Sequence, residues 1–468
     1  MTPTTALLTA LHVALSALVT AHVLLRKREV GSAIGWIGLA WLSPFVGSAI
    51  YGLFGVNRVR RRAGALARRA LPPVGDAGGP TQPGAHAAGS LAEALDRSGQ
   101  RLTRRAAVAG NAVELLRDGD AAYPRMLAAI EAARSRIGLS SYIFRDDAAG
   151  GPVIDALIRA QARGVEVRVV IDGVGGGYFR SAAFRRLRRA GVPAARFMHS
   201  PLPWNMPFLN LRSHKKILVV DDRIGFTGGL NIGAENLVGT DPPDAVRDTH
   251  FMLHGPVVRQ LAEAFDADWC FASGGRHWAF APAAPGPGGV AARVVTSGPD
   301  RDIEKIEATM LQAVVCARRS VLVMTPYFLP DERLVSVIAL AARRGVAVDL
   351  VVPARSNHRP VDWAMRAHVG PLLQAGCRIW LNPPPFDHSK LMVVDGEWSL
   401  IGSANWDMRS LRLNFELDVE VYDTAIAQAI AARIGAGQGQ RLTIEALARR
   451  PLPARLRDAA MRLALPYI

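Results

Sequence analysis

The pattern His-x-Lys-x-x-x-x-Asp occurs twice in this chain, and no other feature restricts the possible folds as much. Each copy supplies a histidine, a lysine and an aspartate: His214, Lys216 and Asp221 in the first copy, and His388, Lys390 and Asp395 in the second. With 11 histidines in 468 residues, composition predicts only ~0.01 chance matches to this motif. Asn231 and Asn405 each follow the histidine of their copy by 17 residues. These matched spacings indicate an internal duplication.

The segments before the two motifs predict the same order of elements: a helix, a short apolar strand, a second helix and a β-branched strand. The expected elements are 123–134, 137–144, 153–163 and 165–171 in the first copy, and 303–318, 321–327, 333–344 and 346–352 in the second. Alternating strands and helices indicate βαβ units. We therefore expect an α/β fold of two pseudo-symmetric α/β/α repeats with mixed, largely parallel sheets.

The duplicated polar residues suit chemistry on a phosphodiester. Histidine and lysine lie two residues apart on a strand, so both side chains face the same side and can enter one pocket. Two lysines and two asparagines can hold the negative oxygens while charge redistributes in the transition state. One histidine can attack phosphorus while the other protonates the departing alkoxide. The pattern therefore predicts a double displacement.

Each histidine is expected to have a carboxylate partner on one ring nitrogen. Glu416, 28 residues after His388, is the candidate in the second copy. Asp248 is the candidate in the first copy, displaced along the sequence by the longer loop 239–245. We therefore expect each carboxylate to serve the histidine of its own repeat.

Two apolar stretches at the N-terminus predict a membrane hairpin. Residues 4–25 carry no formal charge, and residues 30–56 form a second uncharged stretch with Trp36, Trp41 and Tyr51 as interfacial anchors. The alternative for the first stretch is a cleaved signal peptide, although no basic residue precedes it. The alternative for the second is a re-entrant or interfacial segment, because Pro44 weakens a straight helix.

The net charge of +16 predicts an anionic partner, and both nucleic acid and an acidic membrane surface qualify. The apolar hairpin favours the membrane. Six arginines follow the second stretch, against three basic residues between the two stretches: Arg58, Arg60, Arg61, Arg62, Arg68 and Arg69. We therefore expect a multi-pass membrane protein with a cytoplasmic catalytic part.

These observations divide the chain into four parts. We expect two transmembrane helices in 1–57, a basic, Pro/Gly-rich linker in 58–106, a first repeat in 107–285 and a second repeat in 286–468. The C-terminal stretch 454–468 alternates basic and apolar residues. It could form an amphipathic helix on an anionic bilayer or an ordinary helix packed on the second repeat. Three dispersed cysteines give no structural zinc site.

At this point the sequence resembles the phospholipase D superfamily, in which the repeated signature is called the HKD motif. Within that superfamily it is similar to the bacterial cardiolipin synthases. Five strings carry the closer resemblance: Leu209-Asn210-Leu211-Arg212, Arg247-Asp248-Thr249-His250, Thr325-Pro326-Tyr327-Phe328-Leu329-Pro330, Asn405-Trp406-Asp407-Met408-Arg409-Ser410 and Asn414-Phe415-Glu416. Gly229 stands where the family commonly has serine.

The resemblance implies a phosphatidyl transfer between two phosphatidylglycerol molecules, which gives cardiolipin and glycerol through a phosphohistidine. It further implies that His214 is the nucleophile and His388 the general acid, and that no metal or cofactor is needed. Phosphate would be held by two lysines and two asparagines: Lys216, Lys390, Asn231 and Asn405. Asp221 and Asp395 would support the site, and the enzyme would lie in the bacterial inner membrane.

Two other readings use the same residues. A different phospholipase D-type transphosphatidylase or a phospholipid hydrolase differs only in what resolves the intermediate, which depends on how the pocket excludes water. A nuclease also cleaves phosphodiesters, but the apolar N-terminus argues against it. The aromatic residues also do not interleave with basic clusters as base stacking requires. We expect no nucleic-acid partner.

Overall fold

The computed structural model describes residues 2–27, 30–52, 86–200, 211–280, 286–300 and 302–463. The chain divides into two compact units, residues 1–66 and 67–468. Five features from the sequence lie partly or wholly outside the described residues: the end of the second apolar stretch (53–56), the arginine cluster 58–69, the linker up to residue 85, the start of the string 209–212 and the end of the C-terminal stretch (464–468).

Among its described residues, the N-terminal unit contains one helix long enough to cross a membrane. Helix α1 spans Pro3–Arg26, or about 36 Å at 1.5 Å per residue. Helix α2 (Val30–Leu42) lies against α1, and the Ser16 hydroxyl donates to the Ala40 carbonyl at 2.8 Å. Helix α2 ends just before Pro44, and α3 (Val46–Ile50) follows. Because α2 covers only about 20 Å, the second span stays a prediction.

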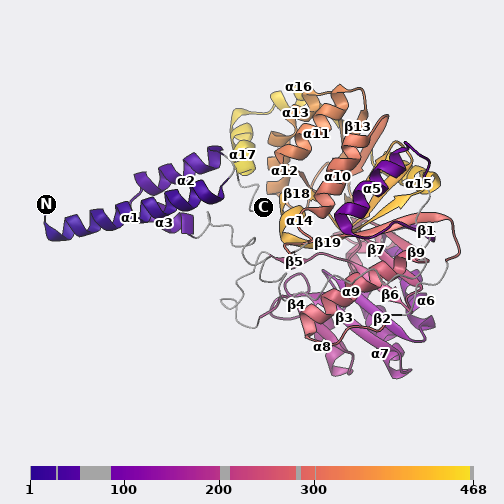
Figure 1. Ribbon diagram of the computed structural model, residues 1–468. Helices are drawn as coiled ribbons and strands as arrows, with labels where there is room; N and C mark the ends of the chain where they lie inside the picture. Colours follow the sequence, from indigo (N-terminus) through magenta and orange to yellow (C-terminus); the bar gives the residue numbers. More distant parts are fainter. Residues whose placement is uncertain are drawn as a thin grey trace. The chain divides into compact units, whose positions relative to one another are not determined.

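The first half of the larger unit begins with helix α5 and contains strands β1–β9 (Figure 1). Its elements are α5 (Leu91–Thr103), β1 (Val108–Arg117), α6 (Asp118–Ala132), β2 (Arg136–Ser141), α7 (Gly150–Ala162), β3 (Glu166–Asp172), α8 (Ala182–Arg189), β4 (Ala194–Phe197), β5 (Arg212–Ser213), β6 (Ile217–Val220), β7 (Ile224–Gly228), η3 (Ala234–Asn236), η4 (Val238–Thr240), β8 (Val246–Arg247), β9 (Thr249–His254) and α9 (Val257–Ser273).

The second half repeats this order and adds C-terminal helices. Its elements are β10 (Val290–Ser297), α10 (Lys305–Cys316), β11 (Ser320–Met324), β12 (Phe328–Leu329), α11 (Glu332–Arg343), β13 (Ala347–Pro353), α12 (Arg359–His368), α13 (Gly370–Gln374), β14 (Arg378–Asn382), β15 (Phe386–Asp387), β16 (Leu391–Val394), β17 (Trp398–Gly402), β18 (Trp406–Asp407), α14 (Met408–Leu413), β19 (Asn414–Tyr422), α15 (Thr424–Gly435), β20 (Gln440–Leu442), α16 (Ile444–Ala448) and α17 (Leu452–Leu463).

One mixed sheet runs through both repeats. Its main order is β20-β14-β13-β11-β16-β17-β19-β10-β1-β9-β7-β6-β2-β3-β4. The order reads the same outward from the β1–β10 pair in both directions, apart from the additional β20 at one edge. The expected duplication and mixed α/β sheet are confirmed.

The expectation that parallel pairs would predominate is wrong. In the described sheet, parallel pairing is limited to β2–β3–β4, β11–β13–β14 and the short β5–β19 pair. The motif strands are joined by tight turns to their neighbours, and such hairpins are antiparallel: β6 pairs with β7, and β16 with β17. The strands at the repeat boundary are antiparallel as well.

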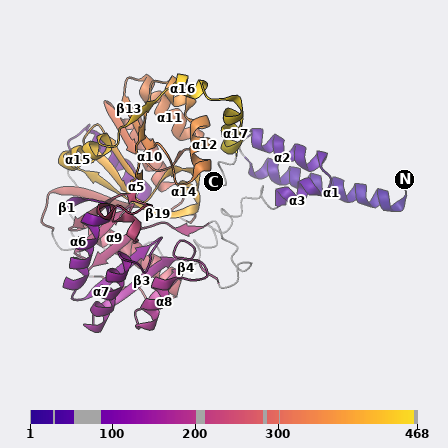
Figure 2. The same cartoon turned by 180° about the vertical axis from the view of Figure 1, so that it is seen from behind.

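Helices cover both faces of this sheet (Figures 1 and 2). Helices α9 and α15 share one apolar cluster with residues from strands of both repeats. On the other face, α6 and α7 pack in the first repeat, and α10 and α11 pack in the second. Alternating side chains divide a strand between the faces, as in β3, where Val169 and Val170 belong to different clusters.

Part of the expected linker is folded. Ser90 accepts a hydrogen bond from the Glu93 amide and caps α5, and Leu91 and Leu95 are buried in the core of the second repeat. The fully buried Arg293 guanidinium donates to the carboxylates of Asp96 and Glu420 at 2.7 and 2.6 Å. The linker reading of residues 91–103 is therefore wrong, because a short amphipathic helix docks there on the second repeat.

Candidate active site

The two motif histidines meet because a two-residue strand directly before each motif pairs with the other repeat. Strand β5 pairs with β19, and the His214 amide donates to the Phe415 carbonyl at 2.9 Å. Strand β15 pairs with β8, and the His388 amide donates to the Arg247 carbonyl at 2.8 Å. The centroids of the two imidazole rings lie 6.2 Å apart. One site therefore forms at the junction of the repeats.

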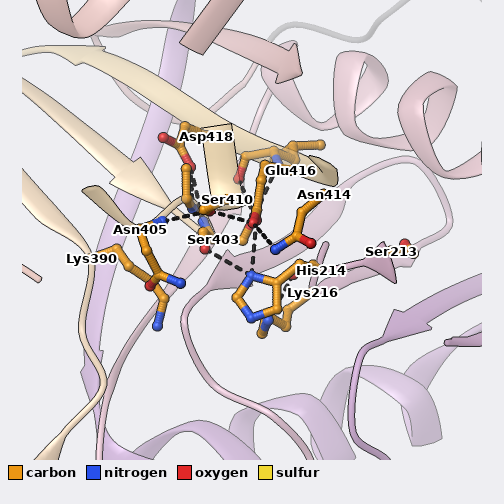
Figure 3. Close-up of polar contacts among 12 residues, drawn as sticks. Ser213, His214, Lys216, Lys390, Ser403, Asn405, Ser410, Asn414, Glu416 and Asp418 are labelled. Carbon is orange, nitrogen blue, oxygen red and sulfur yellow. Dashed lines mark hydrogen bonds and ion pairs between the residues drawn. The ribbon is translucent and has the colours of Figure 1, made fainter. Parts of the chain in front are cut away.

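The carboxylate beside His214 comes from the second repeat (Figure 3). Glu416 Oε2 lies 2.9 Å from His214 Nδ1. The same carboxylate accepts hydrogen bonds from Ser403 Oγ and Ser410 Oγ, both at 2.6 Å, and from the Asn414 amide at 3.1 Å. Glu416 is thus held by three donors besides the imidazole.

The carboxylate beside His388 comes from the first repeat. Asp248 Oδ2 lies 2.9 Å from His388 Nδ1, and Lys390 Nζ lies 2.8 Å from the same nitrogen. The expected pairing within each repeat is therefore wrong, because Glu416 serves His214 and Asp248 serves His388. The crossing of β5 and β15 into the other repeat carries each histidine to the carboxylate of that repeat.

The two motif lysines are buried in the same site. Burial, together with the neighbouring Lys390 charge, lowers the pKa of Lys216 to about 7. Burial likewise lowers the pKa of Lys390, to about 8. Both ammonium groups also donate to a backbone carbonyl of the preceding histidine. Two positive charges held together without solvent favour an anion between them.

The histidines are poised as neutral bases. Burial lowers the pKa of His214, and burial followed by the Lys390 charge lowers that of His388 to about 4. Burial alone would raise the pKa values of Asp248 and Glu416, but the adjacent histidines and lysines lower both overall. Both carboxylates are therefore ionised and can hold an imidazole proton on Nδ1. Such a proton leaves the Nε2 lone pair free.

The two asparagines differ in what their side chains contact. Asn231 Oδ1 accepts a hydrogen bond from the Ile143 amide at 3.3 Å, which orients the amide group. Asn405 is buried, and its Oδ1 has no hydrogen-bond partner within the described part of the chain. A buried unpaired polar atom beside the lysines is an unmet contact that a ligand or water can satisfy.

The motif aspartates do not reach the histidines. Asp221 and Asp395 stand in the turns after β6 and β16, at the other end of each motif strand. The Asp221 carboxylate accepts hydrogen bonds from the backbone amides of residues 134–136 at 2.8–2.9 Å. The Asp395 carboxylate accepts hydrogen bonds from those of residues 318–320 at 2.7–2.9 Å. Each aspartate thus ties the motif strand to the start of the adjacent strand.

Sequence reasoning missed the aromatic walls and the hydroxyls of the site. The Tyr142 ring lies 5.0 Å from His214, and the Tyr327 ring lies 6.3 Å from His388. Tyr142 lies near the end of the predicted strand 137–144 and Tyr327 ends the predicted strand 321–327, which was an available signal. Ser410 lies in one of the strings that carry the family resemblance, and Ser403 lies two residues before that string, but the contact of both with Glu416 requires the fold.

Elsewhere in the described part of the chain, one group of side chains has metal-ligand chemistry. Asp266, Cys270 and His277 place one ligand atom each within 4.8 Å of the others. Asp266 is already bound by the Arg168 guanidinium at 3.2 Å and by the Trp278 amide at 3.0 Å. Because these contacts satisfy the carboxylate, we assign no metal to this group.

Comparison with known proteins agrees with this architecture. The profile of the family described as "Cardiolipin synthase, PLD-like domain" matches residues 126–269 and 310–436. The crystal structure of phosphatidylserine synthase from Haemophilus influenzae superposes with a TM-score of 0.58 at 16% identity. The match covers 80% of this chain and 100% of that one. The duplicated sheet and the paired motifs define a protein of the phospholipase D class.

Curated relatives narrow the class. The major cardiolipin synthase ClsA of Bacillus subtilis is 36% identical over 366 residues, which cover 76% of each chain. The cardiolipin synthase of Geobacillus kaustophilus is 32% identical over 462 residues, which cover 95% of this chain and 90% of that one. The chain therefore belongs to the cardiolipin synthase family.

Proposed function

We propose that this chain is a cardiolipin synthase, a phosphatidyltransferase that joins two phosphatidylglycerol molecules and releases glycerol. The observation that carries the proposal is the site at the repeat junction. Two imidazoles with centroids 6.2 Å apart, each held by a carboxylate from the other repeat, face two buried lysines. The curated relatives at 32–36% identity carry the same activity in their names.

His214 is the nucleophile in this proposal. Its Nδ1 faces two acceptors, Glu416 Oε2 at 2.9 Å and the Ser403 carbonyl at 3.1 Å. Both acceptors favour a proton on Nδ1, which leaves a lone pair on Nε2 for attack on phosphorus. The new P–N bond forms as the bond from phosphorus to the glycerol oxygen breaks.

His388 is the general acid and then the general base. It protonates the departing glycerol oxygen, so glycerol leaves as a neutral alcohol. His388 takes up this proton when substrate binds, because the phosphate anion opposes the burial and the Lys390 charge that otherwise lower the pKa of His388. Neutral His388 then takes a proton from a hydroxyl of the second phosphatidylglycerol, whose oxygen attacks phosphorus as the P–N bond breaks.

Lys216 and Lys390 hold the phosphate oxygens throughout, with the amides of Asn231 and Asn405. Preorganised positive groups in a buried site cost no solvent reorganisation when charge moves to the equatorial oxygens. Asp221 and Asp395 position the motif strands and do not touch substrate.

The proposed substrates also fit the rest of the chain. Helix α1 is long and apolar enough to place the protein at the bilayer that contains phosphatidylglycerol. We assign the chain to the bacterial inner membrane as a multi-pass protein with the catalytic unit in the cytoplasm, on the basis of the arginines that follow the second apolar stretch.

The first experiment tests the reaction. Purified protein in detergent is incubated with phosphatidylglycerol alone, and the products are resolved by mass spectrometry beside the variants His214→Ala and His388→Ala. Cardiolipin and glycerol are expected, with losses of 10³-fold or more in both variants. Phosphatidic acid as the main product would make the protein a hydrolase and overturn the synthase proposal.

A second experiment separates the two histidines. Phosphatidyl-p-nitrophenol carries a leaving group that departs as a stable anion, so its release does not need an acid. His388→Ala is expected to release a burst of nitrophenol and accumulate phosphatidyl-enzyme, whereas His214→Ala releases none. The reverse pattern would assign the nucleophile to His388.

A further inference from the structure

Helix α17 exposes an apolar stripe. Leu452, Leu456 and Leu463 have 64%, 61% and 78% of their surface exposed. With Ala459, they repeat at intervals of four, three and four residues, which places them on one face of the helix. Large apolar side chains aligned on an exposed face mark an interaction surface rather than random surface apolarity.

The opposite face of α17 packs against the rest of the second repeat. Helix α17 packs on α12, and the Arg457 guanidinium lies 4.1 Å from the Trp363 ring centroid. Asp458 is buried and pairs with Arg450 and Arg457, both at 2.8 Å. The helix is therefore held in place, and its leucines face outward because the inward positions are filled.

Basic side chains border the leucine stripe. Arg455 and Arg462 are exposed and lie beside the leucines on the helix surface, on the side away from Arg457. An exposed apolar stripe with arginines along one side complements an anionic lipid surface, in which leucines enter the acyl boundary and guanidinium groups meet phosphates.

Another exposed apolar side chain, separate from the leucine stripe, lies on a loop of the first repeat. Phe179 is 80% exposed in the segment that follows β3. The Arg196 guanidinium donates to the carbonyls of Gly173, Gly177 and Tyr178 at 2.6–3.0 Å. The loop is therefore held by Arg196 with Phe179 at its surface.

Topology places both features at the edge of the sheet where the site lies. The Phe179 loop follows the carboxyl end of β3, and α12, on which α17 packs, follows the carboxyl end of β13. Strands β2–β3 and β11–β13 are parallel, and the segments after β2 and β11 carry Tyr142 and Tyr327 beside the two histidines. Both views show α17 and β4 on the same flank of the larger unit (Figures 1 and 2).

We propose that the leucine stripe of α17 and the Phe179 loop together dock the site edge of the catalytic unit onto an anionic bilayer. The docked edge gives a lipid headgroup direct access to the histidines without full extraction of the lipid. The proposal adds a binding surface to the proposed function, and the first test below does not depend on catalysis.

The test places an environment-sensitive fluorophore on single cysteines of the full chain. Leu456→Cys, Phe179→Cys and the control Ala162→Cys are labelled in a Cys316→Ser, His214→Ala background, because Cys270 and Cys377 are buried and turnover must be prevented. Ala162 ends α7, at the opposite edge of the sheet. The proteins are reconstituted in phosphatidylcholine vesicles with or without phosphatidylglycerol, which carry nitroxide-labelled lipid.

Nitroxide is expected to quench the labels at 456 and 179 but not the label at 162, and phosphatidylglycerol should strengthen this difference. Equal quenching at all three positions would overturn the proposal. A label at 456 that is shielded from water but not quenched would assign the stripe to a second copy of the chain, which also overturns it.

An activity ratio gives an independent readout, and this arm rests on the proposed function. Leu452, Leu456 and Leu463 are replaced together by serine, and turnover is compared in vesicles and in detergent micelles. The vesicle-to-micelle ratio is expected to fall about tenfold, because leucine burial no longer contributes to docking. Leu340→Ser, an exposed leucine on α11, should leave the ratio unchanged. An unchanged ratio in the triple variant would contradict the proposal.

Discussion

At the residue scale, the two carboxylates of the site stand in unequal surroundings. Glu416 receives a hydrogen bond from the Ser403 hydroxyl, whereas the matched position in the first repeat is Gly229. A Cβ at Gly229 would overlap the carboxylate of Asp248. The missing hydroxyl therefore reflects space, because Asp248 occupies the volume that a serine would need. This difference separates the environments of the two imidazoles, as a division into nucleophile and acid requires.

Gly229→Ala is expected to displace Asp248 from His388 and to lower kcat by about 10²-fold, since a misplacement of about 1 Å at a catalytic group has effects of this size. The matched variant Ser403→Ala removes one of several hydrogen bonds to Glu416 and should lower kcat less. Steady-state kinetics with phosphatidylglycerol measure both. A wild-type kcat in Gly229→Ala would show that the contact between Asp248 and His388 does not matter for turnover.

The lysines predict an alkaline limit on activity. Phosphate binding requires both ammonium groups, and their pKa values are about 7 for Lys216 and about 8 for Lys390 in the free protein. The kcat/KM for phosphatidylglycerol should therefore fall as pH rises through this range. The alkaline limb of kcat should lie at higher pH, because bound phosphate raises both pKa values. A kcat/KM that stays constant up to pH ~10, the usual pKa of lysine, would contradict a role for these two lysines in phosphate binding.

At the scale of elements, the motif aspartates act as clamps between strands. Asp221→Asn and Asp395→Asn remove the negative charge of a carboxylate that accepts several hydrogen bonds from backbone amides. Each variant should lower the free energy of unfolding by about 1–2 kcal/mol, a value reduced for partial solvent exposure. The kcat per folded molecule should stay close to wild type, unlike that of Lys216→Met. Denaturant unfolding and active-site titration test this prediction. A large loss of kcat with unchanged stability would show that the aspartates take part in the reaction.

The helices and strands were largely predictable, since amphipathic helices and apolar strands such as 321–327 are recognisable from local sequence patterns. The histidines, lysines and asparagines of the site were also readable, because duplication repeats their spacing. The carboxylate pairing was not, because β5 and β15 are two-residue strands whose partners lie about 200 and 140 residues away. Helix α5 was missed because its apolar residues are few and its docking depends on Arg293.

At the scale of the whole molecule, the two repeats form one catalytic body. Strands β1 and β10 join them in a continuous sheet, and α9 and α15 share one apolar cluster beneath it. Since each histidine takes its carboxylate from the other repeat, neither repeat contains a complete histidine–carboxylate pair. One chain therefore supplies both histidine–carboxylate pairs of the site.

This architecture predicts the result of mixing two inactive variants. His214→Ala and His388→Ala damage different repeats of the same site, so co-expression and co-reconstitution should give no more activity than the sum of the separate proteins. A dimer that exchanged repeats would instead combine two intact halves and regain activity. Cardiolipin formation from phosphatidylglycerol measures the outcome, with a wild-type and His214→Ala mixture as the control for recovery. Restored activity in the mixed variants would show that the site forms between chains.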